Sequence, residues 1–163
     1  MCPKNSHRED LIPMKKTIIA LLLAGVMLLA AGCGASAKTV DAADCMEYIM
    51  ENVAFADQLS EIDRDVIAWR YSVAEDVEAV VYVGSGATAE EACVFVCADE
   101  AAAKTVYEQV EFHLQDMIAS FGSYLPAEVV KLENAVFLQQ GNAVILVVSS
   151  DDAAADKLDK YLK

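Results

Sequence analysis

Basic residues are scarce in this chain, which has 12 Lys and Arg against 26 Asp and Glu and a formal net charge of −14 at pH 7. From Cys33 onward the net charge is 8 − 24 = −16. Nucleic acids and anionic lipid surfaces attract basic patches, so the charge argues against both as partners. We expect an acidic, well-solvated surface, and recruitment of cations or basic partners is the alternative.

Histidine is almost absent, because His113 is the only one from Cys33 onward. A histidine pair for a metal is therefore missing from that part, and it has no Cys-x-x-Cys motif either. A Ser–His–Asp arrangement would have to use His113 without a nucleophile-elbow motif. We expect His113 to lie on the surface of a helix, and we predict no catalytic residue, metal ligand or cofactor.

The apolar run at residues 17–31 is too short for a comfortable transmembrane helix. Its 15 residues would span about 22 Å at ~1.5 Å per residue, against a hydrocarbon core of about 30 Å. Lys15 and Lys16 precede the run, and small residues at positions 30–32 follow it. A basic head, an apolar body and a small-residue cleavage site predict a secretory signal peptide over residues 14–32.

Cys33 directly follows the small residues, and this arrangement resembles the lipobox of bacterial lipoproteins. In that family the cysteine becomes the new N-terminus and carries a diacylglyceryl group, so the resemblance implies that Cys33 is lipidated. Ala30 stands where the family usually has Leu, which lowers the expected efficiency of cleavage. Two acyl chains suffice for stable anchoring at about 0.8 kcal/mol per buried methylene. We therefore expect a lipid anchor in the cell membrane, with the protein on its extracytoplasmic face.

The rest of the chain divides into three parts. Residues 1–13 form a polar upstream extension, and the start is either Met1 or Met14, of which Met14 is the better start for a signal. Residues 33–38 are a short lipidated tether. Residues 39–163 are long enough for one extracytoplasmic domain with a real core.

Three further cysteines, Cys45, Cys93 and Cys97, follow Cys33. An odd number leaves at least one thiol free or paired between chains. On one strand Cys93 and Cys97 would lie about 13 Å apart, whereas a disulfide requires Cα atoms within about 7 Å. We expect small buried side chains, and a bridge from Cys45 to either of the other two stays open.

Apolar periodicity predicts an α+β domain. Residues 39–53 have helical spacing, and residues 55–73 form a second helix or a wrapped loop, with Trp69 against the core rather than stacked on a ligand. The helix that begins at Asp99 has one apolar stripe, and another helix begins at Asp151. The predicted strands are residues 77–83, 91–97, 135–138 and 143–149.

The order strand, strand, helix therefore occurs twice, and both helices begin with acids followed by alanines. We predict duplicated ββα units, which give a four-stranded antiparallel sheet with helices packed on one face. The strands at residues 93–97 and 144–148 are apolar at nearly every position, so they should be central or covered on both faces. The N-terminal helix is the candidate for the second cover.

Three kinds of polar motif in the sequence are candidate sites. Residues 84–86 (Gly-Ser-Gly) lack the Lys of a phosphate-binding loop and are expected to be a hairpin loop. Glu61, Asp63 and Asp65 have calcium-like spacing without the EF-hand Gly and closing Glu, so a solvated cluster is favoured over a metal site. Two acidic pairs are expected to be exposed: Glu90 with Glu91, and Asp151 with Asp152.

Several segments together resemble the domain of unknown function numbered 4358, which occurs in small lipoproteins of Gram-positive bacteria. The resemblance begins near Asp41 and implies an anchored extracytoplasmic domain without an established activity. The segments are residues 59–62, 79–87, 124–129, 132–136 and 141–142.

We therefore expect a non-enzymatic lipoprotein that binds an envelope protein, a peptide or a small ligand. The alternatives are a metal-dependent hydrolase that uses the acids around Asp63 and an accessory protein of envelope assembly.

Overall fold

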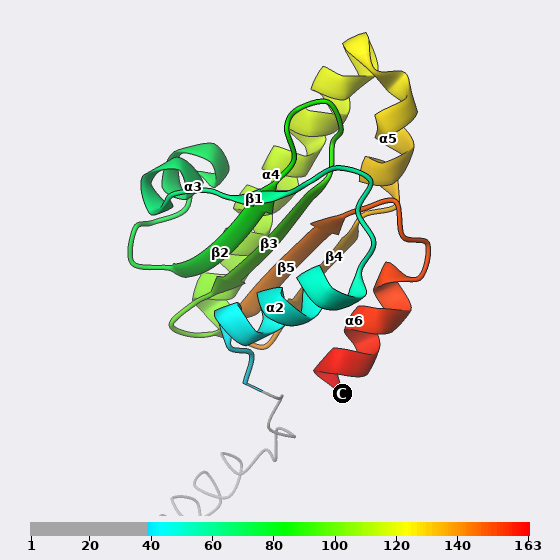
Figure 1. Cartoon of the computed structure of the whole chain (residues 1–163). Coiled ribbons are helices and arrows are strands. Elements are labelled where there is room, and N and C mark those ends of the chain that lie inside the picture. Colours follow the sequence, from blue (N-terminus) through cyan, green and yellow to red (C-terminus); the bar gives the residue numbers. More distant parts are fainter. Residues whose placement is uncertain (1–38) are drawn as a thin grey trace, which may run out of the picture. The chain divides into compact units, whose positions relative to one another are not determined.

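The structure is a computed structural model, and it describes residues 39–163. Within this range the chain forms an α+β domain in which one antiparallel sheet lies between helices (Figure 1). No helix of this part is both long and apolar enough to cross a membrane. The elements are α2 (Ala42–Asn52), β1 (Ser60–Glu61), α3 (Arg64–Tyr71), β2 (Glu78–Val83), β3 (Glu91–Val96), α4 (Glu100–Tyr124), α5 (Pro126–Glu133), β4 (Val136–Gln140), β5 (Ala143–Val148) and α6 (Ala154–Leu162).

The sheet has the order β1-β2-β3-β5-β4 over the described residues, and every neighbouring pair is antiparallel. The two central strands, β3 and β5, pair from Glu91 opposite Val148 to Val96 opposite Ala143. Every residue of β5 is buried, as expected for a strand that is covered on both faces. The predicted central position of these two apolar strands is therefore confirmed.

Helices cover both faces of the sheet (Figure 1): the N-terminal helix α2 covers the second face, as expected, and α6 joins it there, which was not predicted. On the α4 face, α4 packs against Val81, Cys93 and Phe95. On the α2 face, α2 and α6 pack against Val94 and Ile145. Two central strands with apolar side chains on both faces require apolar cover on each side, and α4 with its 25 residues already occupies one of them.

The predicted four-stranded sheet is corrected to five strands in the described domain. The extra strand, β1, and the helix α3 both lie in the segment for which a helix or a wrapped loop was predicted. The two hairpins and their following helices occur in the predicted order, but α4 and α6 lie on opposite faces of the sheet. The structure therefore does not confirm the duplication.

The long helix α4 follows the predicted stripe. Asp99 caps its first turn by accepting a hydrogen bond from the backbone N–H of Ala102 at 2.8 Å. The helix ends at Tyr124, and Pro126 begins α5 at a position where the missing N–H costs nothing. The buried stripe consists of Val106, Val110, Leu114, Met117 and Phe121.

Asp151 joins the start of α6 to the segment after α2. Its carboxylate accepts hydrogen bonds from Lys157 and from the backbone N–H groups of Ala54 and Ala153. The hydrogen bond from Lys157 is the largest effect on the pKa of Asp151 and helps to lower it to about 2. Asp151 is therefore half-buried and engaged, contrary to prediction, whereas Asp152 is exposed as expected.

Candidate functional site

The candidate site is built around Glu91, the first residue of β3, whose side chain is 1% exposed. Its Oε1 lies 2.9 Å from His113 Nε2 of α4. Its Oε2 accepts hydrogen bonds at 3.1 Å from both Arg70 Nη2 and the Tyr71 hydroxyl of α3. Because an ionised carboxylate can only accept, His113 Nε2 carries the proton in this contact. Glu91 of the sheet thus accepts hydrogen bonds from three side chains on two helices, α3 and α4.

Both charges of the Arg70–Glu91 pair are maintained despite burial. Burial is the largest effect on the pKa of Glu91 and raises it, but the hydrogen bond and charge of His113 and the charge of Arg70 outweigh it and hold the pKa below its ordinary value. Burial likewise lowers the pKa of Arg70 most, and the charge of Glu91 overcomes it and raises the pKa. The pair is therefore an ion pair at neutral pH.

Cys93 lies behind this pair and extends the hydrogen-bond chain. Its thiol donates to the Tyr71 hydroxyl at 3.2 Å, and that hydroxyl donates to Glu91. Burial is the main reason that the pKa of Cys93 and the pKa of Tyr71 lie well above their ordinary values. A protonated, buried thiol is a poor nucleophile, so the chain of hydrogen bonds is suited to holding groups in place.

Four predictions about these residues are wrong. His113 is 9% exposed and Glu90 and Glu91 are each 1% exposed, although all three were expected on the surface. Trp69 was expected in the core but is 83% exposed, because Ile67 and Tyr71 form the inward face of α3. A usable signal existed for His113, which lies three residues after Val110 and four before Met117 in the apolar stripe.

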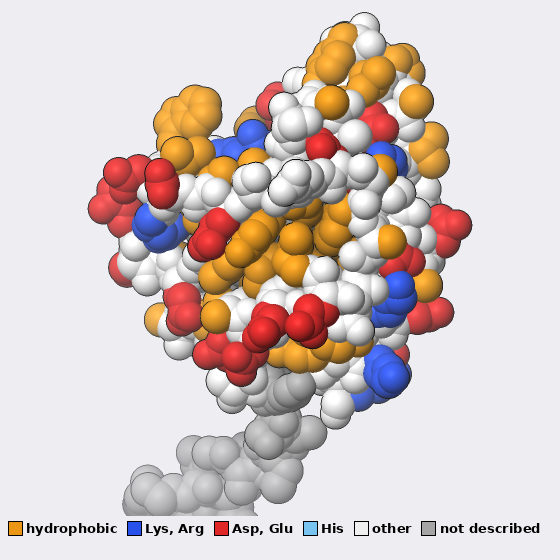
Figure 2. Space-filling view, viewed as in Figure 1, with side chains coloured by type: hydrophobic (Ala, Val, Ile, Leu, Met, Phe, Trp, Pro, Cys, Tyr) orange, Lys and Arg blue, Asp and Glu red, His pale blue; other side chains and the backbone are white. Residues whose placement is uncertain are grey.

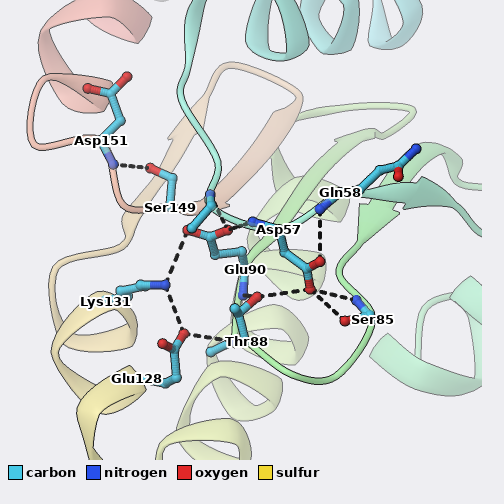
Figure 3. A network of polar contacts seen from close by, with 11 residues as sticks. Asp57, Gln58, Ser85, Thr88, Glu90, Glu128, Lys131, Ser149 and Asp151 are labelled. Carbon is cyan, nitrogen blue, oxygen red and sulfur yellow. Dashed lines mark hydrogen bonds and ion pairs between the residues drawn. The ribbon is translucent and has the colours of Figure 1, made fainter.

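Glu90, the neighbour of Glu91 in the chain, is also 1% exposed and anchors a second network of polar contacts (Figure 3). Its Oε2 accepts hydrogen bonds from the backbone N–H groups of Ala56 and Asp57 at 2.7 and 2.8 Å. Its Oε1 lies 3.3 Å from Lys131 Nζ, which also contacts Glu128 at 3.0 Å. Glu90 therefore ties the segment before β1 to helix α5, and the exposed role predicted for it is excluded.

The loop after β2 donates hydrogen bonds to the carboxylate of Asp57 (Figure 3). Asp57 Oδ2 accepts hydrogen bonds from Ser85 N and Ser85 Oγ, both at 2.8 Å, and from Thr88 Oγ1 at 3.2 Å. The side-chain hydrogen bond from Ser85 is the main reason that the pKa of Asp57 is lowered. The Gly84-Ser85-Gly86 segment is thus a loop between paired strands, as predicted, and it binds an acid of the same chain.

Gly84→Ala is expected to destabilise the domain by about 1–3 kcal/mol, because the loop has no room for a side chain. A Cβ at Gly84 would lie 2.8 Å from Asp57 Oδ2 and 3.2 Å from the Glu90 carbonyl oxygen. The control is Gly122→Ala in α4, because a Cβ at this position would meet only Val129 at 3.9 Å. This substitution should stabilise the domain by roughly 0.5–1 kcal/mol. Urea unfolding of both variants measures the difference, and equal midpoints would contradict the tight fit.

Arg70 lies between two adjoining hollows on the surface of the domain. The first, of about 300 Å³, is lined by the loop at residues 84–86, Glu91 and Tyr124. The second, of about 320 Å³, is lined by Trp69, His113 and Asp116, and Arg70 lines both. The side chain of Arg70 is 34% exposed, so a guanidinium fixed by buried partners faces solvent at this point.

The remaining predicted sites are located as follows. Cys33, the predicted lipidation site, lies outside the described residues. Cys45, Cys93 and Cys97 are all buried, as expected, and Cys93 and Cys97 are free thiols, so neither is bridged to Cys45.

The acids at Glu61, Asp63 and Asp65 are exposed, and Glu61 and Asp63 line one hollow of about 320 Å³. Over residues 39–163, no group of three or more His, Cys, Asp or Glu side chains is placed to hold a metal ion.

Comparison with known families identifies the class of the domain. Residues 44–149 match the family described as Domain of unknown function (DUF4358). The match extends over more than half of the chain, and the chain therefore belongs to this family. No curated protein and no solved structure matches it significantly.

Proposed function

We propose that this chain is a lipid-anchored extracytoplasmic binding module without enzymatic activity. In this proposal, a lipid on Cys33 holds the domain at the cell membrane, and the domain binds an envelope protein, a peptide or a small ligand. The observation that carries the binding role is Arg70, which buried partners fix in one position while a third of its side chain faces two hollows.

A binding role is favoured over catalysis by the way the reactive groups are used. Glu91 accepts from Arg70, Tyr71 and His113 at once, which leaves it poorly placed to exchange a proton with a substrate. Cys93 is completely buried and its raised pKa keeps the thiol protonated. These groups instead hold the guanidinium rigidly, and rigid donors lose less entropy when a ligand binds.

The hollows define which chemical groups a ligand would carry. Within residues 39–163, the hydrogen bonds of Arg70 to oxygen use Nε and Nη2, so Nη1 can donate to a carbonyl or carboxylate. Trp69 and Tyr124, which are 83% and 60% exposed, add aromatic surface to the second and first hollow respectively. A peptide with a carbonyl-rich backbone and apolar side chains has both features.

Trp69→Ala is expected to weaken ligand binding at least tenfold, since exposed Trp side chains often dominate binding surfaces. The matched control is Phe112→Ala, because Phe112 is 75% exposed on the neighbouring helix but lines neither hollow. The full chain would be captured from detergent-solubilised membranes, and bound molecules identified and quantified by mass spectrometry. Loss of the same partner with Trp69→Ala but not with Phe112→Ala supports the proposal. Equal capture by both variants, or no reproducible partner, contradicts it.

A further inference from the structure

The two edges of the sheet are protected very differently. At one edge, β1 covers the end of β2, and the uncovered part of β2 begins with Glu78 just after Asp76. At the other edge, β4 has the sequence Val-Phe-Leu-Gln-Gln, with neither a charged residue nor a proline. Charges, prolines and short strands are the usual means by which proteins prevent edge-to-edge pairing. β4 has none of these protections over its five residues.

The hairpin geometry determines which backbone groups of β4 face outward. Gln140 and Ala143 flank the two-residue turn at Gly141, so they form a hydrogen-bonded pair. Since alternate residues of an antiparallel strand bond to opposite sides, Phe137 and Gln139 direct their N–H and C=O groups away from β5. No other backbone hydrogen bond within residues 39–163 reaches Phe137 or Gln139. Within the described residues, the outward backbone groups of Phe137 and Gln139 therefore lack a backbone partner, which another strand can supply.

The charge distribution makes the β4 edge a place where a second copy of this chain meets little charge repulsion. The described domain has 7 basic and 24 acidic residues, so two copies repel each other over most of their surfaces. β4 is uncharged, and α6, which packs beside it, has two Asp and two Lys residues. Three of the seven basic residues, Lys157, Lys160 and Lys163, lie in or directly after α6. Figure 2 shows acidic side chains along α2 and basic side chains near α6.

We propose that β4 pairs antiparallel with β4 of a second copy across a two-fold axis at Leu138, which joins the two sheets into one. In this register Phe137 of each copy exchanges both backbone hydrogen bonds with Gln139 of the other. Val136 lies opposite Gln140, and no charged side chain is opposed by another. The interface is the same patch on both copies, as a two-fold dimer requires.

The register makes a specific prediction for disulfide trapping. On the two-fold axis, Leu138 of one copy lies opposite Leu138 of the other in a non-hydrogen-bonded pair. The Cα atoms of such a pair are about 4.5 Å apart, a separation that a disulfide spans. Gln140 lies on the same face of β4 as Leu138. In this register, however, Gln140 of one copy and Gln140 of the other are about 13 Å apart along the strand direction. Leu138→Cys should therefore form a disulfide-linked dimer of the full chain in membranes treated with diamide, and Gln140→Cys should not.

A second experiment disrupts the β4–β4 pairing by a substitution that introduces no cysteine. Gln139→Pro deletes an outward N–H and no β4–β5 hydrogen bond, and it should weaken dimerisation at least tenfold in sedimentation velocity. Gln139→Ala, which lacks only the side-chain bonds to Glu100 and Gly141, should dimerise as the wild type does. The proposal is overturned if Gln140→Cys is trapped as efficiently as Leu138→Cys. It is also overturned if Leu138→Cys forms no disulfide-linked dimer or becomes linked to a different protein.

Discussion

Glu91→Ala is expected to lower the free energy of unfolding by about 3–5 kcal/mol, the usual cost of breaking a buried ion pair by removing one partner. The substitution leaves Arg70, Tyr71 and His113 without their shared acceptor in the core. Each unpaired buried donor carries a desolvation penalty. Urea unfolding of the purified chain measures the loss.

The matched control is Glu78→Ala, since Glu78 also begins a strand of the same sheet but is exposed. Its free energy of unfolding should change by no more than about 0.5 kcal/mol. A loss below 1 kcal/mol for Glu91→Ala, or equal losses for both variants, would mean that the network contributes little.

The network also predicts the direction of a pH effect. The pKa of Glu91 lies below its ordinary value of 4.5 in the folded state, so its stabilisation is complete above that value and is lost as the pH falls through the folded pKa. The stability difference between the wild type and Glu91→Gln should therefore narrow as the pH falls below 4.5. A difference that stays constant into the acid range would show that Glu91 does not ionise in the folded chain.

Cys33→Ala is expected to abolish labelling of the protein by a fatty-acid probe. The proposed anchor consists of two acyl chains on this one side chain, and each buried methylene contributes about 0.8 kcal/mol. Labelling in growing cells, followed by gel electrophoresis and mass measurement, is the decisive readout. Membrane fractionation is less informative, because an uncleaved signal segment could itself hold the chain at the membrane.

The control for lipidation is Cys2→Ala, which removes the other cysteine upstream of the domain. This variant should be labelled as strongly as the wild type, because Cys2 lies outside the lipobox resemblance. Persistent labelling of Cys33→Ala would contradict the lipid anchor and leave the binding role of the domain to be tested separately.

The secondary structure was largely predictable because it depends on local periodicity. The apolar stripe from Val106 to Phe121 and the continuous apolar runs of β3 and β5 identify their elements without reference to the rest of the chain. The helix faces were harder, because whether α6 joins α4 or α2 depends on which sheet face still lacks cover. The short strand β1 has two residues, too few for any periodic signal.

The candidate site was not predictable in the same way. Glu91 looks like an ordinary surface acid in sequence, and its partners Arg70 and His113 are 21 and 22 residues away. A charge can be buried only where partners compensate its desolvation, and local sequence does not reveal such partners. Trp69 was misplaced for the related reason that the short helix α3 turns Tyr71, rather than Trp69, toward the sheet.

The sequence by itself determined the acidic charge, the α+β class and the two apolar central strands, and it predicts the signal peptide and the lipidation of Cys33. These properties follow from composition and short-range patterning, which need no knowledge of distant contacts. Only the tertiary structure decided that α4 and α6 lie on opposite faces of the sheet, that Glu91 accepts from three donors, that Arg70 lines two hollows and that β4 is an edge strand. Each of these depends on which segments meet across the sheet, and packing rather than local preference determines that.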